Sequence, residues 1–406
     1  MKNKIKKVAL VQPNMKWLDW NWKTSWDIHP LNLCFLGAMI KDDYEVTIVD
    51  ANLENYSPNQ FKSVIRDLDP NLVGITLLTN EYSGIAHLGA KLVKEVNMDL
   101  ITVLGGVYAT VSYKSIYEDK NIDYICVGEG EHVFPQFLKY LNGKEKFPQE
   151  GFLGRRAGEL TNPLKVKRAL VENLNELPLP AWDLVDYNKY TNRVGKVTVD
   201  RPYDFPYTRL MTSRGCPVGC TFCEVEVISG GPFRYRGPEK VIEELEFLKT
   251  NYGIKSFMLD DDNFFVNRKR ARAVLKYMID KNIEMKWKAH AVPVFHLDEE
   301  IIELMKQAGC QSVALAIESG SERVLKEIIH KPVKLEQVRH ICKKVKLEGM
   351  DLVANFIIGF PTETWTEIRQ TFAFAEELEI DYAKFFIATP LEGTVLHDMV
   401  LKNNLL

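Results

Sequence analysis

Short apolar runs alternate with helix-like patterns of apolar and polar positions through the first 141 residues. Continuous apolar runs of this length predict strands that are buried on both faces, and the stretches between them repeat apolar residues at helical spacing. The alternation predicts an open, doubly wound parallel sheet that binds its ligand beyond the carboxyl ends of its strands. The predicted strands are Lys7–Val11, Glu45–Val49, Leu72–Leu77, Ile101–Leu104 and Tyr124–Val127, and the predicted helices are Leu33–Ile40, Gln60–Leu68, Ile85–Glu95 and His132–Leu141.

From Asn142 to about Pro206 the alternation gives way to glycine, proline and charged residues, which predict a structured connector. Six further apolar runs follow, each succeeded by a helical pattern except the last. Because eight such units close a full barrel, six predict a partial (β/α)6 barrel. The predicted domains are residues 1–143, 144–206 and 207–406, and the predicted barrel strands are Leu210–Ser213, Ser256–Leu259, Met285–Ala289, Ser312–Ile317, Val353–Ile358 and Lys384–Ala388.

The composition is that of an ordinary soluble globular protein, with 46% hydrophobic and 26% charged residues among 406. A net charge of −3 without a clustered positive stretch gives no reason to expect a nucleic-acid partner. Four lysines occur in the first seven residues, but the apolar run after them is too short for a signal peptide. No segment reaches membrane-spanning length, so we expect a cytoplasmic protein.

Three of the seven cysteines, Cys216, Cys220 and Cys223, fall within eight residues. An odd count in a long chain argues against a disulfide framework. A structural zinc site uses four protein ligands, whereas three thiolates suit a four-iron cluster with one iron left open. The alternative is a zinc site completed by a distant fourth ligand. The other four cysteines are interpreted as small buried hydrophobes: Cys34, Cys126, Cys310 and Cys342.

The Cys-x-x-x-Cys-x-x-Cys spacing, with Phe222 before the last cysteine, resembles the signature of the radical S-adenosylmethionine (radical SAM) superfamily. Three further stretches at the ends of the second, fourth and fifth predicted barrel strands agree with it, where a barrel places its chemistry. They are residues 258–264, 316–321 and 356–363, and the resemblance covers about residues 207–395.

This resemblance implies that the three cysteines hold a 4Fe-4S cluster whose open iron binds S-adenosylmethionine. Asp261 and Asp262 stand in place of the usual Gly-Gly-Glu and would accept hydrogen bonds from the methionyl ammonium. The other implied contacts are to the ribose and the adenine, and they come from Glu318, Ser319, Gly359 and Phe222. The alternative for the acidic residues is capping of the helices that follow them.

The first domain carries neither a dinucleotide fingerprint nor a P-loop, since Val133 occupies the third glycine position after Gly128 and Gly130. Glycines at three strand ends would form a rim without side chains, against which a large planar ligand could lie. This Rossmann-like arrangement is similar to the cobalamin-binding domain of one radical SAM class. The similarity implies cobalamin contacts from Asp50, Thr76, Gly105, Gly106, Gly128 and Glu129.

One feature of this domain departs from the cobalamin-binding pattern. Asp50 is not followed two residues later by histidine, so the lower face of cobalt would lack a histidine ligand. A structural domain that has lost its cofactor is the alternative. Four tryptophans after the first predicted strand would wall the ligand or plug the space between domains: Trp17, Trp20, Trp22 and Trp26.

The two cofactors together imply an enzyme that methylates an unactivated carbon of a small molecule or peptide. In the resembling class a 5′-deoxyadenosyl radical removes the hydrogen and methylcobalamin delivers the methyl group, with an electron donor such as flavodoxin or ferredoxin. The alternatives are a cobalamin-linked cyclisation or rearrangement, and a corrinoid carrier or sensor without catalysis. Methylthiolation is disfavoured, because only Cys34 and Cys126 precede Cys216 where a second cysteine triad would be needed.

Overall fold

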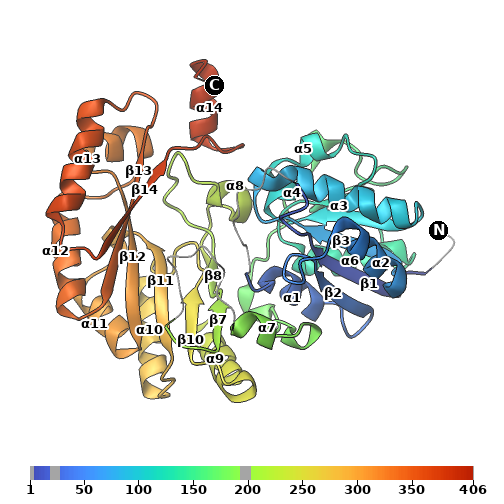
Figure 1. Ribbon diagram of the computed structural model, residues 1–406, viewed down its shortest axis with the longest axis horizontal. Coiled ribbons are helices and arrows are strands. Elements are labelled where there is room, and N and C mark those ends of the chain that lie inside the picture. Colours follow the sequence, from blue (N-terminus) through green and yellow to red (C-terminus); the bar gives the residue numbers. More distant parts are fainter. Residues whose placement is uncertain (1–3, 19–27, 193–202, 406) are drawn as a thin grey trace. The chain divides into compact units, whose positions relative to one another are not determined.

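The computed structural model describes residues 4–18, 28–192 and 203–405 (Figure 1). The described chain forms two compact units. The first contains the residues up to Glu172 and those from Glu176 to 192, and the second contains Asn173–Asn175 and the residues from 203 onward. Within this described part, no helix is long and apolar enough to cross a membrane.

The first unit is built on a six-stranded sheet with the order β2-β1-β3-β4-β5-β6. The first five strands run parallel, and only β6 is antiparallel to its neighbour. The bounds of the parallel strands follow the apolar runs closely, because the inner strands are buried on both faces, whereas the edge strand β2 is only partly buried. The strands are β1 (Lys7–Gln12), β2 (Glu45–Asp50), β3 (Leu72–Thr76), β4 (Ile101–Gly105), β5 (Tyr124–Cys126) and β6 (Phe152–Leu153).

Helices cover both faces of this sheet, as predicted for a doubly wound fold. One core gathers side chains from α2, α3 and α4, and the other gathers side chains from α1 and α6. The helices are α1 (Leu31–Ala38), α2 (Pro58–Leu68), α3 (Ser83–Val96), α4 (Val107–Val111), α5 (Tyr113–Ile116), α6 (Gly130–Leu141) and α7 (Asn188–Thr191), with short 3-10 turns η1 (Asn80–Tyr82), η2 (Pro163–Lys165) and η4 (Trp182–Leu184). A further 3-10 turn, η3 (Leu174–Glu176), contains residues of both units.

The second unit is the predicted partial barrel. Its six strands are all parallel and lie in the order β7-β10-β11-β12-β13-β14, so each strand pairs with the next one along the barrel. Figure 1 shows the helices that follow the strands packed on the outside of this sheet. The strands are β7 (Tyr207–Leu210), β10 (Ser256–Leu259), β11 (Lys286–Val292), β12 (Cys310–Glu318), β13 (Asp351–Ile358) and β14 (Tyr382–Ile387).

The remaining elements of the second unit frame the strand ends. A two-stranded ribbon of β8 (Ser213–Arg214) and β9 (Arg234–Tyr235) follows β7. The helices are α8 (Val225–Ser229), α9 (Pro238–Tyr252), α10 (Arg268–Asp280), α11 (Glu299–Gln307), α12 (Leu335–Leu347), α13 (Trp365–Glu377) and α14 (Val395–Lys402), with the 3-10 turn η5 (Val294–His296) and the π-helix η6 (Val324–Ile329).

Two predicted elements differ from the structure. The first barrel strand ends at Leu210 rather than Ser213, because Thr212 and Ser213 bond to Asp261 and begin the cysteine loop. The segment after residue 142 contributes β6 to the first sheet, and Ala169 forms a bridge to Gly128. The β6 pairing and the bridge between Gly128 and Ala169 use backbone groups, which leave no trace in the apolar pattern.

The scattered cysteines are buried as predicted, each at most 6% exposed: Cys34, Cys126, Cys310 and Cys342. Of the four tryptophans, Trp17 packs on Phe61 with ring centroids 5.0 Å apart and donates to the Tyr56 carbonyl oxygen at 2.8 Å. These contacts make Trp17 part of the first unit's core. Trp20, Trp22 and Trp26 lie outside the described residues.

Candidate functional site

The three clustered cysteines, Cys216, Cys220 and Cys223, lie on one loop between β8 and α8, beyond the carboxyl end of the barrel's first strand. Gly215 opens the loop at φ +85°, and a Cβ there would overlap the carbonyl oxygen of Pro232, so only glycine fits. Thr221 fastens the loop from the other side, because its amide donates to the Ile329 oxygen at 3.0 Å and its hydroxyl to the Ile328 oxygen at 2.8 Å.

The thiols of this loop affect one another electrostatically. Burial raises the pKa of Cys220 to about 12, and the nearby Lys331 ammonium acts in the opposite direction. Burial likewise raises the pKa of Cys223 to about 11, with the charge of Cys216 adding to the shift. Thiols in this state must release protons when they take up a metal centre.

The donor set fits an iron–sulfur cluster by its chemistry. Three thiols from one loop are half-buried, and the ammonium of Lys331 lies close enough to offset thiolate charge. Within the described residues, no set of three or more His, Cys, Asp or Glu side chains is already gathered as ligands around a metal ion. These three thiols are the groups that would hold the cluster.

The two aspartates predicted to serve the methionyl ammonium face the cysteine loop. Asp261 accepts from the Thr212 amide at 2.5 Å, and from the Thr212 and Ser213 hydroxyls at 2.6 and 2.5 Å. Burial raises the pKa of Asp261, and the Arg270 guanidinium at 3.9 Å opposes this shift. Asp262 is more exposed and accepts from the Gly215 amide at 2.7 Å. Asp261 is therefore buried against the donors of Thr212 and Ser213, whereas Asp262 is partly exposed.

Glu318 ends β12 in a strained backbone conformation, with φ +74° next to a register shift in the β12–β13 pairing. Such strain in a residue other than glycine costs on the order of 1–3 kcal/mol and concentrates at functional sites. Its carboxylate is buried and accepts from the Lys331 ammonium at 2.6 Å, which also donates to the Ala316 oxygen at 2.8 Å. Lys331 thus fixes the side chain that the resemblance assigns to the ribose.

The other predicted S-adenosylmethionine contacts differ in how accessible they are. Ser319 is fully buried and hydrogen-bonds the Thr371 hydroxyl at 3.1 Å, so its side chain supports the strand end. Gly359 adopts φ +85°, and a Cβ there would meet only Ile387, at 3.9 Å. Its backbone is therefore open to a close approach. Phe222 lies against Phe360, with ring centroids 6.0 Å apart.

In the first unit, the end of β4 packs against the end of β3. Gly106 adopts φ +89°, and a Cβ there would come within 2.7 Å of both the Leu77 oxygen and the Thr76 hydroxyl. Gly105 is different, since its added Cβ would meet only the Cys126 Cβ at 3.6 Å. Thr76 accepts from the Asn32 side chain at 2.9 Å. Glycine is thus required at position 106 by the packing of the β3 and β4 ends, whereas position 105 has room for a Cβ atom.

The Gly128 turn is covered by the connector. A Cβ at Gly128 would overlap the Ala169 carbonyl oxygen, and the Glu129 amide donates to that same oxygen at 2.9 Å. The Glu129 carboxylate accepts from the Val171 amide at 2.6 Å. The absence of a side chain at Gly128 therefore lets residues 168–171 of the connector approach closely. At this one of the three strand ends, the connector occupies the space that the sequence predicted to be a rim without side chains.

Asp50 has structural partners of its own. It accepts from the Leu53 amide at 2.8 Å and from the Tyr190 hydroxyl at 2.9 Å. It stands at the end of β2, three strand spacings or roughly 14 Å from Gly105 on β4. Asp50 and Tyr190 line a cavity of about 240 Å³, together with the Glu54–Lys189 ion pair at 2.6 Å. Asp50 therefore belongs to a different part of the sheet edge from the glycines.

One buried hydroxyl joins two of the glycine turns. Thr110 in α4 donates to the Gly106 oxygen at 2.9 Å and accepts from the Gly128 amide at 2.9 Å. We expect Thr110→Val to destabilise the first unit by about 1 kcal/mol, because the Gly128 amide loses its acceptor. Thr110→Ser keeps the hydroxyl and loses only a buried methyl group, so in urea denaturation it should lose less stability than Thr110→Val. Equal stability of the valine and serine variants would show that the two hydrogen bonds of the Thr110 hydroxyl do not stabilise the unit.

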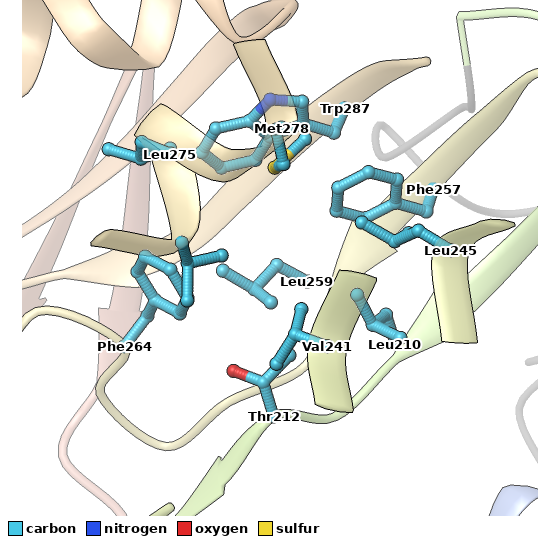
Figure 2. A pocket seen from close by; sticks show the side chains of 11 residues that line it. Leu210, Thr212, Val241, Leu245, Phe257, Leu259, Phe264, Leu275, Met278 and Trp287 are labelled. Atoms are coloured by element: carbon cyan, nitrogen blue, oxygen red, sulfur yellow. The ribbon is translucent and has the colours of Figure 1, made fainter. Parts of the chain in front are cut away.

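A second cavity, shown in Figure 2, lies between the barrel sheet and helices α9 and α10. Apolar side chains including Leu259, Phe257 and Trp287 surround it. Its volume of about 10 Å³ is at the lower limit for a single water molecule. This space is a packing gap in the outer layer, so the candidate site of the second unit is the set of strand ends around the cysteine loop.

Sequence reasoning missed several residues that the structure brings to these sites: Lys331, Asn263, Thr110 and Tyr190. Lys331 and Asn263 touch predicted site residues, namely Glu318 and Cys216. The position of Asn263 directly after Asp262 was a usable signal. No local pattern points to Lys331, because it is the fold of the intervening segment, which contains the π-helix η6, that brings Lys331 to Glu318.

Comparison with known proteins agrees with both units. The model of the radical SAM superfamily matches residues 210–375, and that of the B12 binding domain matches residues 23–138. An uncharacterized methyltransferase of Pyrococcus horikoshii is 35% identical over 379 residues, covering 93% of this chain and 79% of the relative. The cytidylyl-2-hydroxyethylphosphonate methyltransferase of Streptomyces wedmorensis is 30% identical over 421 residues, covering 91% of this chain and 77% of the relative.

Solved structures share the fold of the whole chain. The radical S-adenosylmethionine methyltransferase TsrM of Kitasatospora setae, with cobalamin and a [4Fe-4S] cluster bound, superimposes with a TM-score of 0.77 at 17% identity, covering 98% of this chain and 75% of TsrM. Together with the family matches and the relatives of at least 30% identity, this confirms the predicted fold and the predicted family. The chain belongs to the radical SAM superfamily of enzymes, in the group that carries a B12-binding domain ahead of the radical SAM domain.

Proposed function

We propose that this enzyme transfers a methyl group to an unactivated carbon of a small molecule or peptide. The observation that carries the proposal is the pairing of a B12-binding domain with a radical SAM domain across relatives named methyltransferases. A corrinoid carrier alone would leave the cysteine loop and the strained Glu318 without a role.

When bound, the three cofactors supply a hydrogen-abstracting adenosyl radical and a transferable methyl group. The chain's own residues would bind and orient these groups. Cys216, Cys220 and Cys223 would ligate the cluster, and Asp262 would accept from the methionyl ammonium. Glu318, held by Lys331 at 2.6 Å, would meet the ribose hydroxyls, while the open backbone at Gly359 would admit the adenine. In the first unit, Gly105 offers the approach for the corrin.

The substrate class is proposed from the relatives. The Streptomyces relative is named for a cytidylyl phosphonate, and a second TsrM structure holds tryptophan as substrate, at 18% identity to this chain. Both named substrates are small molecules. An external one-electron donor of the flavodoxin or ferredoxin type would supply the cluster's electron.

The test is anaerobic reconstitution with iron, sulfide and hydroxocobalamin, followed by S-adenosylmethionine carrying a deuterated methyl group and a one-electron reductant. We expect 5′-deoxyadenosine to form and a mass increase of one deuterated methyl group in the accepted substrate, because hydrogen removal and methyl delivery are both required. Mass spectrometry of both products checks this, and the Cys223→Ala variant is the control that should yield neither.

The outcomes separate the alternatives. Formation of 5′-deoxyadenosine with a product that lacks the labelled methyl group would favour cyclisation or rearrangement. An anaerobic magnesium-protoporphyrin IX monomethyl ester cyclase of Rubrivivax gelatinosus, 26% identical over 377 residues, is a relative of that kind. Cobalamin binding without any 5′-deoxyadenosine would indicate a carrier and contradict the proposal.

A further inference from the structure

The tripeptide Asp261–Asp262–Asn263, directly after β10, contacts successive points along the cysteine loop. Asp261 bonds to Thr212 and Ser213, and Asp262 bonds to the Gly215 amide. Asn263 comes next and reaches the first cysteine, with its Nδ2 3.4 Å from the Cys216 sulfur. Three consecutive residues of one strand end thus hold the loop up to its first cluster ligand.

Asn263 differs from its two neighbours in what it contributes to the fold. Its side chain is 3% exposed, and the bond to Cys216 is the only side-chain hydrogen bond it makes in the described part of the chain. Its Oδ1 is buried and has no hydrogen-bond partner among the described residues. Burying an unpaired amide oxygen opposes folding, and an apolar residue of the same size would avoid that penalty. The amide is therefore not explained by the stability of the barrel.

The direction of the contact follows from the chemistry of sulfur. A cysteine sulfur bound to iron carries no hydrogen, so it can only accept a hydrogen bond. The amide must then present its NH2 group to Cys216, which is the orientation in the structure. A hydrogen bond to a cluster sulfur stabilises the reduced, more negative cluster and raises its reduction potential.

We propose that Asn263 is a positioning residue for the iron–sulfur cluster, holding the Cys216 sulfur through its side-chain amide and raising the cluster's reduction potential. The inference rests on the proposed function only in requiring that the three cysteines carry a cluster. It concerns the uptake of one electron by that cluster from an external reductant. It does not depend on which substrate is used or on methyl transfer.

The experiment compares full-length, anaerobically reconstituted wild-type protein with Asn263→Leu, which has nearly the same size but no donor. The readouts are iron content, melting temperature and a dithionite-based redox titration followed by electron spin resonance. At a fixed potential we expect the ratio of reduced to oxidised cluster to fall at least tenfold in the variant, equivalent to about 59 mV for one electron. A second variant, Asn263→Asp, keeps the shape and replaces the donor by an acceptor, so its shift should be in the same direction.

Asn267→Ala is the matched control. Asn267 caps α10 by accepting from the Arg270 amide at 3.0 Å, and within the described residues its side chain makes no hydrogen bond to a cysteine. This variant should therefore lose stability while its cluster potential stays at the wild-type value. Loss of iron from either Asn263 variant, with a melting temperature no lower than that of Asn267→Ala, would also support the positioning role. Wild-type iron content and potential in both Asn263 variants would overturn it. A wild-type protein that binds no cluster would instead refute the proposed function.

Discussion

Replacing any one of Cys216, Cys220 or Cys223 by alanine is expected to abolish the iron–sulfur absorbance and 5′-deoxyadenosine formation. Three thiolates are the minimum that holds a four-iron cluster with one open iron, so a variant with only two of them should not keep the cluster. Iron and sulfide content per chain after anaerobic reconstitution, together with the visible spectrum, measures the loss.

The matched controls are Cys310→Ala and Cys342→Ala. Both thiols are buried within the same unit, at 0% and 1% exposure, so these variants remove a core sulfur without touching the loop. They should lose on the order of 1 kcal/mol of stability and keep their iron. If a variant lacking all three loop cysteines still carried the full iron content, the cluster would have to sit elsewhere.

Gly106→Leu is expected to abolish cobalamin binding. With φ +89° and only 2.7 Å to the Leu77 oxygen and the Thr76 hydroxyl, position 106 accepts no side chain without movement of the β3 and β4 ends. The strain of the left-handed conformation alone contributes on the order of 1–3 kcal/mol of destabilisation. Equilibrium titration with hydroxocobalamin measures the loss, while iron loading of the second unit should persist because its core is separate.

Gly105→Ala separates ligand contact from folding. Its added Cβ makes only an ordinary 3.6 Å contact with Cys126, so the melting temperature of the first unit should stay unchanged. If the corrin approaches this backbone, the methyl group should weaken cobalamin binding at least tenfold, or by about 1.4 kcal/mol. Unchanged affinity for cobalamin in Gly105→Ala would show that the corrin does not approach the end of β4.

The chain's periodicity by itself determined the two α/β units. Strands such as β3 and β12 are buried along nearly all of their length, so each contains a short apolar run that can be recognised without any knowledge of its neighbours. The cysteine spacing is equally local, because one loop has to bring three thiols together. For these features the physical requirement and the sequence pattern lie in the same few residues.

The tertiary structure decided what the other polar residues and glycines touch. Asp261 bonds to Thr212 and Ser213, Gly128 admits Ala169, and Asp50 is paired with Tyr190, 140 positions away. A carboxylate accepts equally well from a ligand or from the protein's own amides, and a glycine permits a close approach by either. Which of them comes near depends on strand order and on the path of the connector. That long-range information is absent from the sequence around each residue.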